Sequence, residues 1–259
     1  MQKTSALYQE LLSSNHSMDT RLTIGETGVL ITNQGDAITF GGVSILTGAS
    51  GADTGYDESL LVSMETENRM FAEESPSVGD CIVGEIYIEM HKPYGEIPTR
   101  ARLVPYTRLT DGVRKSEWIQ KGVYYIDTRT EKDDGSTIEK IVLQGYDDMR
   151  KAEQDYPDST LEWPAKDVDV VREIANFLGV PIDERTFQIM TMGYKIQYPA
   201  GYSCRDVLGY IAAMYAGSFI MSDVGELRLV TIYGIPKETR YLITKDGAQI
   251  TFGGVKILV

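Results

Sequence analysis

The chain of 259 residues is poor in the residues that usually build metal and redox sites, with two cysteines and two histidines. Cys81 and Cys204 lie far apart in the sequence, which favours unpaired structural thiols, although a single disulfide stays open. His16 and His91 have no neighbouring His, Cys or carboxylate at metal-ligand spacing. The sequence therefore predicts no zinc site and no cofactor, and so few histidines also disfavour a Ser-His-Asp triad.

Long apolar runs and an excess of basic charge are also missing. No stretch reaches the roughly 18 apolar residues of a membrane span, and the N-terminus lacks the apolar core of a signal peptide. The chain has 25 Lys and Arg against 38 Asp and Glu, a formal net charge of −13. Such a balance disfavours nucleic-acid binding through phosphate neutralisation, and its simplest interpretation is solubility.

Three short motifs resemble functional sites but are better explained as loops. Asp53-Thr54-Gly55 matches the aspartic-protease signature, yet polar residues flank it and no second copy is present. The surrounding glycine-rich segment, residues 48–59, lacks the Lys-Ser/Thr ending of a phosphate-binding loop. Residues 133–136 lack the ligand spacing of a calcium loop and read as a hairpin turn. We therefore predict no catalytic, cofactor-binding or metal-binding residue.

The sequence predicts an α+β fold, mostly β, in four regions. Residues 1–20 form an N-terminal helix or arm, with Leu7, Leu11 and Leu12 on one side. Residues 21–145 are β-rich. Their clearest signals are the alternation of residues 82–89 and a hairpin around Asp134-Gly135. Trp118 is expected to be a core anchor beneath that hairpin, and Trp163 is interpreted in the same way.

Residues 146–240 are predicted to form a smaller α+β unit of two helices and a hairpin. Val170, Val171, Ile174 and Leu178 share one face of the first helix, which Asp167 can cap and Gly179 ends. The second helix opens with a capping pattern, Ser203 and Asp206, and we expect Gly217 to stop it. A final hairpin turns at residues 223–225.

One segment occurs twice. Residues 31–46 read ITNQGDAITFGGVSIL, and residues 243–258 read ITKDGAQITFGGVKIL, 212 positions later. Such a period is too long for a solenoid, so we interpret both copies as entry strands of related β modules, with turns at Gly35 and Gly247. The second copy is expected to pair with the sheet of the first module or to lie at a subunit contact. The assembly candidates are the apolar residues of the repeat: Ile31, Ile38, Phe40, Ile243, Ile250 and Phe252.

Over about residues 20–235 the order of these elements resembles the N-terminal region of phage and prophage tail-tip or baseplate hub proteins, the family that includes tail-associated lysin-like hubs. The resemblance is carried by fold-determining residues spread along the chain: Gly79, Gly84, Trp118, Gly122, Tyr125, Ile126, Gly145, Tyr146, Asp147, Met149, Arg205, Leu208, Ala213, Gly217, Gly225 and Leu227. Among these, Trp118, Gly122 and Asp147 are the candidate structural anchors.

The resemblance implies a tail-tube-like β-barrel or sandwich module followed by the α+β module, with residues 241–259 opening a second β module. It implies a non-enzymatic virion tail component, assembled in the cytoplasm of the bacterial host as a homotrimer around the tail channel. The implied partners are tube or distal tail, tape-measure and fibre proteins. DNA would pass without specific binding, and no membrane is involved. Two alternatives stay open: a receptor- or carbohydrate-binding tail module, and a cell-wall hydrolase.

Overall fold

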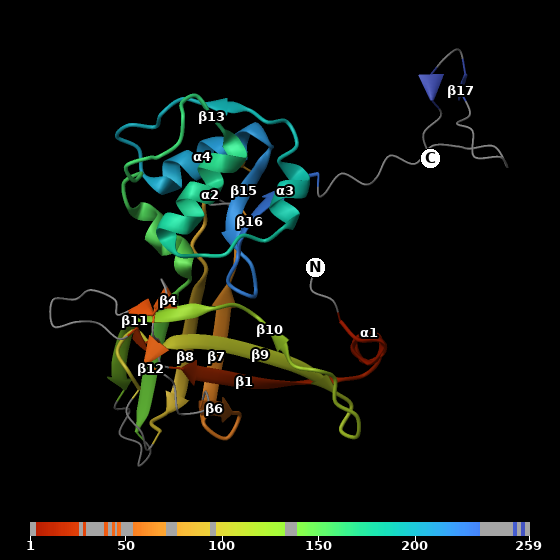
Figure 1. Cartoon of the computed structure of the whole chain (residues 1–259). Helices are drawn as coiled ribbons and strands as arrows, with labels where there is room; N and C mark the ends of the chain where they lie inside the picture. The colour runs from red at the N-terminus through yellow and green to blue at the C-terminus, as the bar shows by residue number, and fades with distance from the viewer. Residues whose placement is uncertain are drawn as a thin grey trace.

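The computed structural model describes residues 4–25, 54–70, 77–93, 97–132 and 139–233, and the backbone of short strand pairs within 28–47 and 251–256. The described chain forms two lobes, a sheet lobe and an α+β lobe (Figure 1). Most regular structure is β and belongs to one large antiparallel sheet. The predicted class, α+β and mostly β, is confirmed.

The sheet lobe is built on an eight-stranded antiparallel sheet. In the order in which they pair, the strands are β6 (Thr54–Asp57), β1 (Ser17–Gly25), β9 (Arg102–Thr110), β11 (Tyr124–Lys132), β12 (Lys140–Tyr146), β8 (Glu85–His91) and β7 (Leu61–Glu67), and β10 (Ile119–Gln120) also pairs with β9. In Figure 1, β1 and β9 run across the view while β7, β8 and β12 run along it, so the sheet is strongly bent.

Alternation of side chains explains the core of the sheet lobe. In β8 the side chains of Ile86, Ile88 and Met90 are fully buried, whereas Glu85 and Tyr87 between them are exposed. Residues of the neighbouring strands complete the cluster, among them Leu22, Leu103, Tyr124, Ile141 and Leu143. The predicted hairpin is confirmed by the pairing of β11 with β12, while its turn lies outside the described residues.

Two sequence predictions for this lobe need correction. The predicted polar loop 48–59 contains a strand, because β6 pairs with β1 from Thr54 to Asp57. The N-terminal helix α1 (Ala6–Leu12) is present and is capped by Ser5, whose hydroxyl accepts a hydrogen bond from the Tyr8 N–H. Its buried side is narrower than predicted, because Leu11 is fully buried but Leu12 is 58% exposed.

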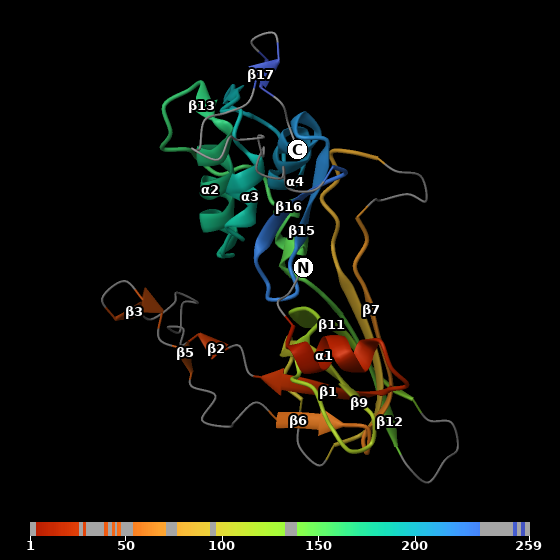
Figure 2. The same ribbon diagram turned by 90° about the vertical axis from the view of Figure 1, so that its right-hand side faces the viewer.

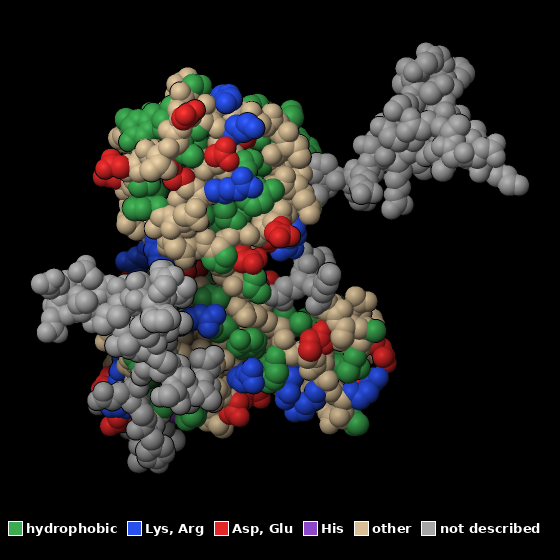
Figure 3. Space-filling model, in the orientation of Figure 1, with side chains coloured by type: hydrophobic (Ala, Val, Ile, Leu, Met, Phe, Trp, Pro, Cys, Tyr) green, Lys and Arg blue, Asp and Glu red, His purple; other side chains and the backbone are tan. Residues whose placement is uncertain are grey.

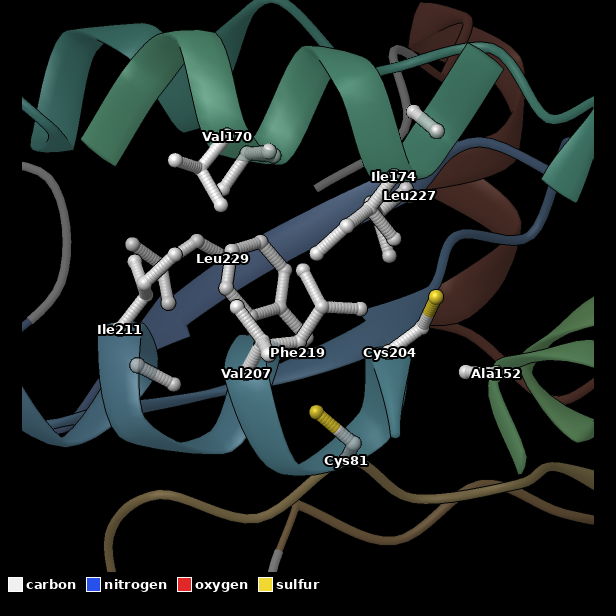
Figure 4. Close-up of a cluster of buried hydrophobic side chains, with 14 of the residues drawn as sticks. Cys81, Ala152, Val170, Ile174, Cys204, Val207, Ile211, Phe219, Leu227 and Leu229 are labelled. Carbon is white, nitrogen blue, oxygen red and sulfur yellow. The ribbon is translucent and has the colours of Figure 1, made fainter. Parts of the chain in front are cut away.

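The α+β lobe contains the remaining long elements. They are η1 (Asp148–Glu153), β13 (Ala165–Lys166), α2 (Asp167–Leu178), α3 (Arg185–Ile189), β14 (Lys195–Ile196), α4 (Cys204–Met214), β15 (Gly217–Met221) and β16 (Leu227–Thr231). Helices α2 and α4 lie over the hairpin of β15 and β16, and enclose a core that includes Phe219 and Leu229 (Figure 4). Cys81 and Cys204 are free and buried in the same core, as predicted.

The predicted apolar stripe of α2 is confirmed, but two helix ends differ from the prediction. Asp167 is the first residue of α2 instead of its cap, and its carboxylate accepts hydrogen bonds from the Val168 N–H and the Tyr215 hydroxyl. Helix α4 begins with the predicted capping box but ends at Met214, before Gly217. The left-handed turn that follows belongs to Ala216, with φ 49°.

The two lobes are joined by more than the connection from β12 to η1. Residues 77–83, between β7 and β8, run up into the α+β lobe beside β15 (Figure 2). There the Gly79 N–H donates to the Gly217 carbonyl at 2.8 Å, and Cys81 forms a parallel bridge with Phe219. The segment crosses α4 closely, since a Cβ at position 209 would lie 2.6 Å from the Gly79 carbonyl oxygen. The α+β core thus includes a segment from the N-terminal half of the chain, with Cys81 in the buried cluster.

Candidate assembly surface

The repeated segments form two hairpins with the same register. In the first copy, β3 (Thr39–Phe40) pairs with β4 (Val43–Ser44), so that Phe40 faces Val43. In the second, β17 (Thr251–Phe252) pairs with β18 (Val255–Lys256), so that Phe252 faces Val255. A Gly-Gly pair separates the two strands in the sequence of each copy, at 41–42 and 253–254. The five-residue sequence TFGGV is therefore accompanied by the same strand pairing in both copies.

Much of the predicted assembly set lies outside the described residues. This applies to Ile31, Ile38, Ile243 and Ile250, and to the turns predicted at Gly35 and Gly247. Among the described strands, β17 and β18 pair only with each other, so the second copy does not join the sheet of the first module there. Contact with another subunit stays a prediction.

Trp118 lies against two arginines instead of among apolar side chains. The guanidinium carbon of Arg108 is 4.2 Å from the ring centroid and that of Arg21 is 4.8 Å away. Arg21 also lies 5.0 Å from the ring of Tyr106. Because side chains alternate along a strand, Arg21 lies on the opposite face of β1 from the buried Leu22. Cation–π contacts therefore cover the outer face of β1, β9 and β10.

The two arginines of this outer face differ in their ion pairs. Asp19 accepts from Arg108 at 2.8 Å and from Lys115 at 3.2 Å, and these contacts lower the pKa of Asp19 against the opposing effect of desolvation. Arg21 forms no ion pair within the described chain, and its Nε is buried without a hydrogen-bond partner. On this face the charge of Arg108 is therefore balanced by Asp19, whereas the charge of Arg21 is not balanced by a carboxylate of the described chain.

Gly122 anchors the turn between β10 and β11 by leaving room for a ring. Its φ is 145°, and a Cβ there would lie 2.3 Å from Cε2 of Tyr124. The Tyr124 hydroxyl accepts a hydrogen bond from Asn68 at 3.1 Å, and burial raises the pKa of Tyr124 to about 12. Glycine is required because any side chain would collide with the buried tyrosine.

Asp147 lies where the chain passes from the sheet lobe into the α+β lobe. Its carboxylate accepts from the backbone N–H groups of Gly84 at 2.8 Å and Met149 at 3.0 Å. Burial raises the pKa of Asp147 to about 7, although these two hydrogen bonds act in the opposite direction. One side chain thus binds both strands that connect the lobes, since Gly84 precedes β8 and Asp147 follows β12.

Beside this junction the surface has a hollow of about 500 Å³ lined by side chains of both lobes. Its charged lining residues are Glu67, Arg69, Glu85, Arg150, Glu153 and Arg205. Arg205 pairs with Glu153 at 3.0 Å, and Arg150 pairs with Asp127 at 2.5 Å. The lining holds as many carboxylates as guanidinium groups, so it favours no ligand of a single charge sign.

Of the catalytic and metal motifs considered from the sequence, Asp53 and residues 133–136 lie outside the described residues, and the two histidines lie on different elements. His16 is bonded to the Ser14 carbonyl in the N-terminal arm, whereas His91 ends β8. In the ranges given above, no three His, Cys, Asp or Glu side chains come together as a potential metal site. None of the helices in the described chain is long and apolar enough to cross a membrane.

Sequence reasoning found part of this surface and missed the rest. Trp118, Gly122 and Asp147 are among the residues that carry the resemblance, and Trp118 is also predicted to be a core anchor from its residue type. Arg21 and Arg108 were missed, although Arg21 alternates with Leu22 in a strand whose outward positions are polar. Their proximity to Trp118 follows from the pairing of β1 with β9, and no local pattern encodes that pairing.

Comparison with known proteins gives matches among solved structures. No protein-family model matches the chain, and no curated protein sequence matches it. A 43 kDa tail protein of prophage MuSo2 from Shewanella oneidensis is 12% identical, with a TM-score of 0.49, over 84% of this chain and 56% of that one. A tail protein from Neisseria meningitidis MC58 is 10% identical, with a TM-score of 0.47, over 89% of this chain and 55% of that one.

A third match is the PdpA–VgrG complex of Francisella, at 10% identity and a TM-score of 0.45, over 82% of this chain and 31% of that one. The chain thus spans little more than half the length of the two tail proteins it matches. Both are described as tail proteins, and the first of them belongs to a prophage.

Proposed function

We propose that the chain is a structural component of a phage or prophage tail tip or baseplate hub and assembles around the tail channel. The observation that carries this proposal is the hairpin formed twice, at 39–44 and at 251–256, with the same register. A chain that presents one local structure at two positions can make the same contact with two equivalent neighbours. Three copies would present six such hairpins, which suits a trimer attached to a sixfold tube.

Other features of the described chain are consistent with this role. The large sheet is open, because β6 and β7 each pair on one side only among the described strands. Unpaired strand edges are suited to contacts between subunits. The net charge of −13 would let DNA pass a channel without specific binding. The partners would be tube or distal tail, tape-measure and fibre proteins, in the virion tail.

Light scattering coupled to size-exclusion chromatography tests the assembly. We expect a mass of three times 28.8 kDa at high protein concentration. Phe40→Ala and Phe252→Ala should each lower the fraction of trimer if the hairpins are contact elements. Phe177→Ala is the matched control, because Phe177 is 44% exposed and belongs to α2 instead of a repeated hairpin. A wild-type protein that stays monomeric at every concentration would contradict the proposal.

A receptor- or carbohydrate-binding module is the second candidate, and one observation favours it. Tyr202 and Tyr210 are 45% and 59% exposed, and their rings meet edge to face at 5.6 Å. The tryptophans support it less, since arginines lie over Trp118 and the rings of Tyr156 and Tyr198 pack against Trp163. Glycan-array binding that Tyr210→Ala abolishes, by a protein that stays monomeric, would favour this second function.

A further inference from the structure

The two ends of the large sheet carry unpaired charges of opposite sign. One end is formed by β6 and β1 and the other by β8 and β7. Among the described strands, β6 and β7 do not pair with each other, so the two ends are available to a second copy, in a head-to-tail contact that closes into a ring if the rotation fits. The inference below rests on the proposed function, because it names the surfaces through which copies would meet.

At the first end the available charge is Arg21. Its side chain is partly exposed and lies over the edge strand, since a Cβ on Gly55 of β6 would be 3.6 Å from Arg21 Cδ. Trp118 and Tyr106 hold the guanidinium by its face. A guanidinium stacked on an aromatic ring still directs its N–H groups outward in its own plane, where they can bind a carboxylate. Figure 3 shows Lys and Arg side chains interspersed with Asp and Glu over the sheet lobe.

The orientation of Arg21 is fixed by its neighbours. Arg108 binds Asp19 and lies over the same tryptophan, so it holds the ring in place without competing for a new carboxylate. Arg21 has no carboxylate partner in the described part of the chain, and its Nε lacks any hydrogen-bond partner there. In a chain with 38 acidic and 25 basic residues, an arginine without a partner is an available binding group.

At the other end the available charges are carboxylates. Glu65, Glu67 and Glu85 are exposed, and they line a hollow of about 410 Å³ beside Tyr87. Glu67 lies directly opposite Glu85 across β7 and β8, an arrangement of like charges that destabilises a strand pair. Arg69 pairs with Glu67, whereas Glu65 and Glu85 form no ion pair within the described chain. A cation from outside would relieve this repulsion.

We propose that the Arg21–Tyr106–Trp118 face of one copy binds the acidic β7 edge of a second copy, with Glu65 and Glu85 supplying carboxylates to Arg21. The contact joins the β1 end of one sheet to the β7 end of the next, and it is heterologous. Its strength depends on ionic strength, because the charges involved are partly or fully exposed.

The test compares two arginines that each lie over an aromatic ring. Arg21→Gln removes the proposed contact. Arg172→Gln is the matched control, because Arg172 lies 4.7 Å from the centroid of Phe187 in the α+β lobe and causes the same change in net charge. Mass is measured by light scattering over a series of protein and salt concentrations. Thermal unfolding by circular dichroism establishes that each variant is folded.

We expect Arg21→Gln to raise the concentration needed for half-assembly about tenfold or more, and Arg172→Gln to leave it within about twofold. Arg21→Glu should abolish assembly, and combining it with Glu65→Arg should restore it in part. Raising salt from about 0.05 to 0.5 M should weaken wild-type assembly more than that of Arg21→Gln.

The outcomes separate this inference from the proposed function. If the wild type assembles and folded Arg21→Gln assembles equally well, the contact is wrong and the tail role stands. Failure of the charge exchange to restore any assembly also contradicts the contact, provided that the double variant is folded. A wild type that never assembles contradicts both.

Discussion

The two lobes are stabilised in different ways. In the α+β lobe the core elements lie almost in sequence between η1 and β16, and one further segment, residues 77–83, is added from outside. In the sheet lobe, β1 pairs with β9 from Ser17–Thr110 to Gly25–Arg102, so its core depends on residues far apart in the chain. Local signals therefore specify most of the α+β lobe, whereas the sheet lobe is specified by contacts between residues far apart in the sequence.

The two lobes also differ in what their surface aromatic rings contact. On the α+β lobe most ring contacts join two aromatic rings, as in the edge-to-face pair of Trp163 and Tyr198 at 5.4 Å, and Arg172 lies over Phe187. On the outer face of the sheet lobe, rings meet guanidinium groups. Each lobe holds one of the two tryptophans, so variants that keep only Trp118 or only Trp163 report the unfolding of one lobe.

The strongest way to separate the lobes is to empty the α+β core. Phe219 is fully buried at the centre of that lobe, and Phe219→Ala should lower its free energy of unfolding by about 3–5 kcal/mol. Urea unfolding followed by Trp163 fluorescence should shift more than unfolding followed by Trp118. Equal shifts of both signals would mean that the lobes unfold as one unit.

The matching change in the sheet lobe is Leu103→Ala. Leu103 is fully buried in β9, and its truncation should cost about 2–5 kcal/mol, with the larger shift now in the Trp118 signal. Val113→Ala is the control, because Val113 is 91% exposed and should change stability by less than about 0.5 kcal/mol. A larger shift in the Trp163 signal would contradict the assignment of cores.

The junction gives a prediction in pH. Because the pKa of Asp147 rises from 3.8 to about 7 on folding, the folded protein binds this proton more tightly than the unfolded chain. The resulting stabilisation is complete below pH about 4 and is lost as the pH rises through about 7.

Between pH 5 and 8 the wild type should therefore lose about 2–3 kcal/mol relative to Asp147→Asn, measured by chemical unfolding at each pH. Parallel pH profiles for the two proteins would show that Asp147 does not titrate in this range. A wild type that gains stability over the same range relative to the variant would reverse the sign.

The smallest effect concerns the turn that supports Tyr124. Gly122→Ala should destabilise the sheet lobe by about 1–3 kcal/mol through backbone strain and collision with the ring. Gly112→Ala is the control, because Gly112 also has positive φ, 90°, but no atom lies within 4 Å of its added Cβ. A larger loss for Gly122→Ala, read from Trp118 fluorescence, is expected from the collision with Tyr124, and equal losses would contradict it.

Helices and hairpins were predictable where the signal is local. The stripe Val170, Val171, Ile174 and Leu178 is buried as predicted, and Ser203 and Asp206 form the predicted capping box. The end of α4 was not predicted, because the left-handed position is filled by Ala216 although a glycine follows at once. Local propensity favours glycine there, and the packing of β15 against β16 decides otherwise, since a Cβ at Gly217 would lie 2.3 Å from the Val230 carbonyl oxygen.

Long-range features of the site were less accessible. The strand β6 was hidden in a glycine-rich segment because its pairing with β1 compensates for weak β propensity. Trp118 was predicted to be a core residue from its type alone. Its arginine neighbours come from β1 and β9, and their approach requires the register of the whole sheet. The division into four regions stays a prediction. Residues 77–83, which belong to the predicted region 21–145, hydrogen-bond to β15 in the predicted region 146–240.

The course of residues 77–83 has a consequence for how this chain can be divided or exchanged. A cut after β12 would divide the chain between the two lobes, but it would remove from the α+β lobe the segment around Cys81, which forms a bridge with Phe219. The separated α+β lobe would then expose the unpaired edge of β15. It would also lose the segment that packs closely against Gly209 of α4. A functional hybrid with another protein would therefore need to take residues 77–83 and the α+β lobe from the same protein.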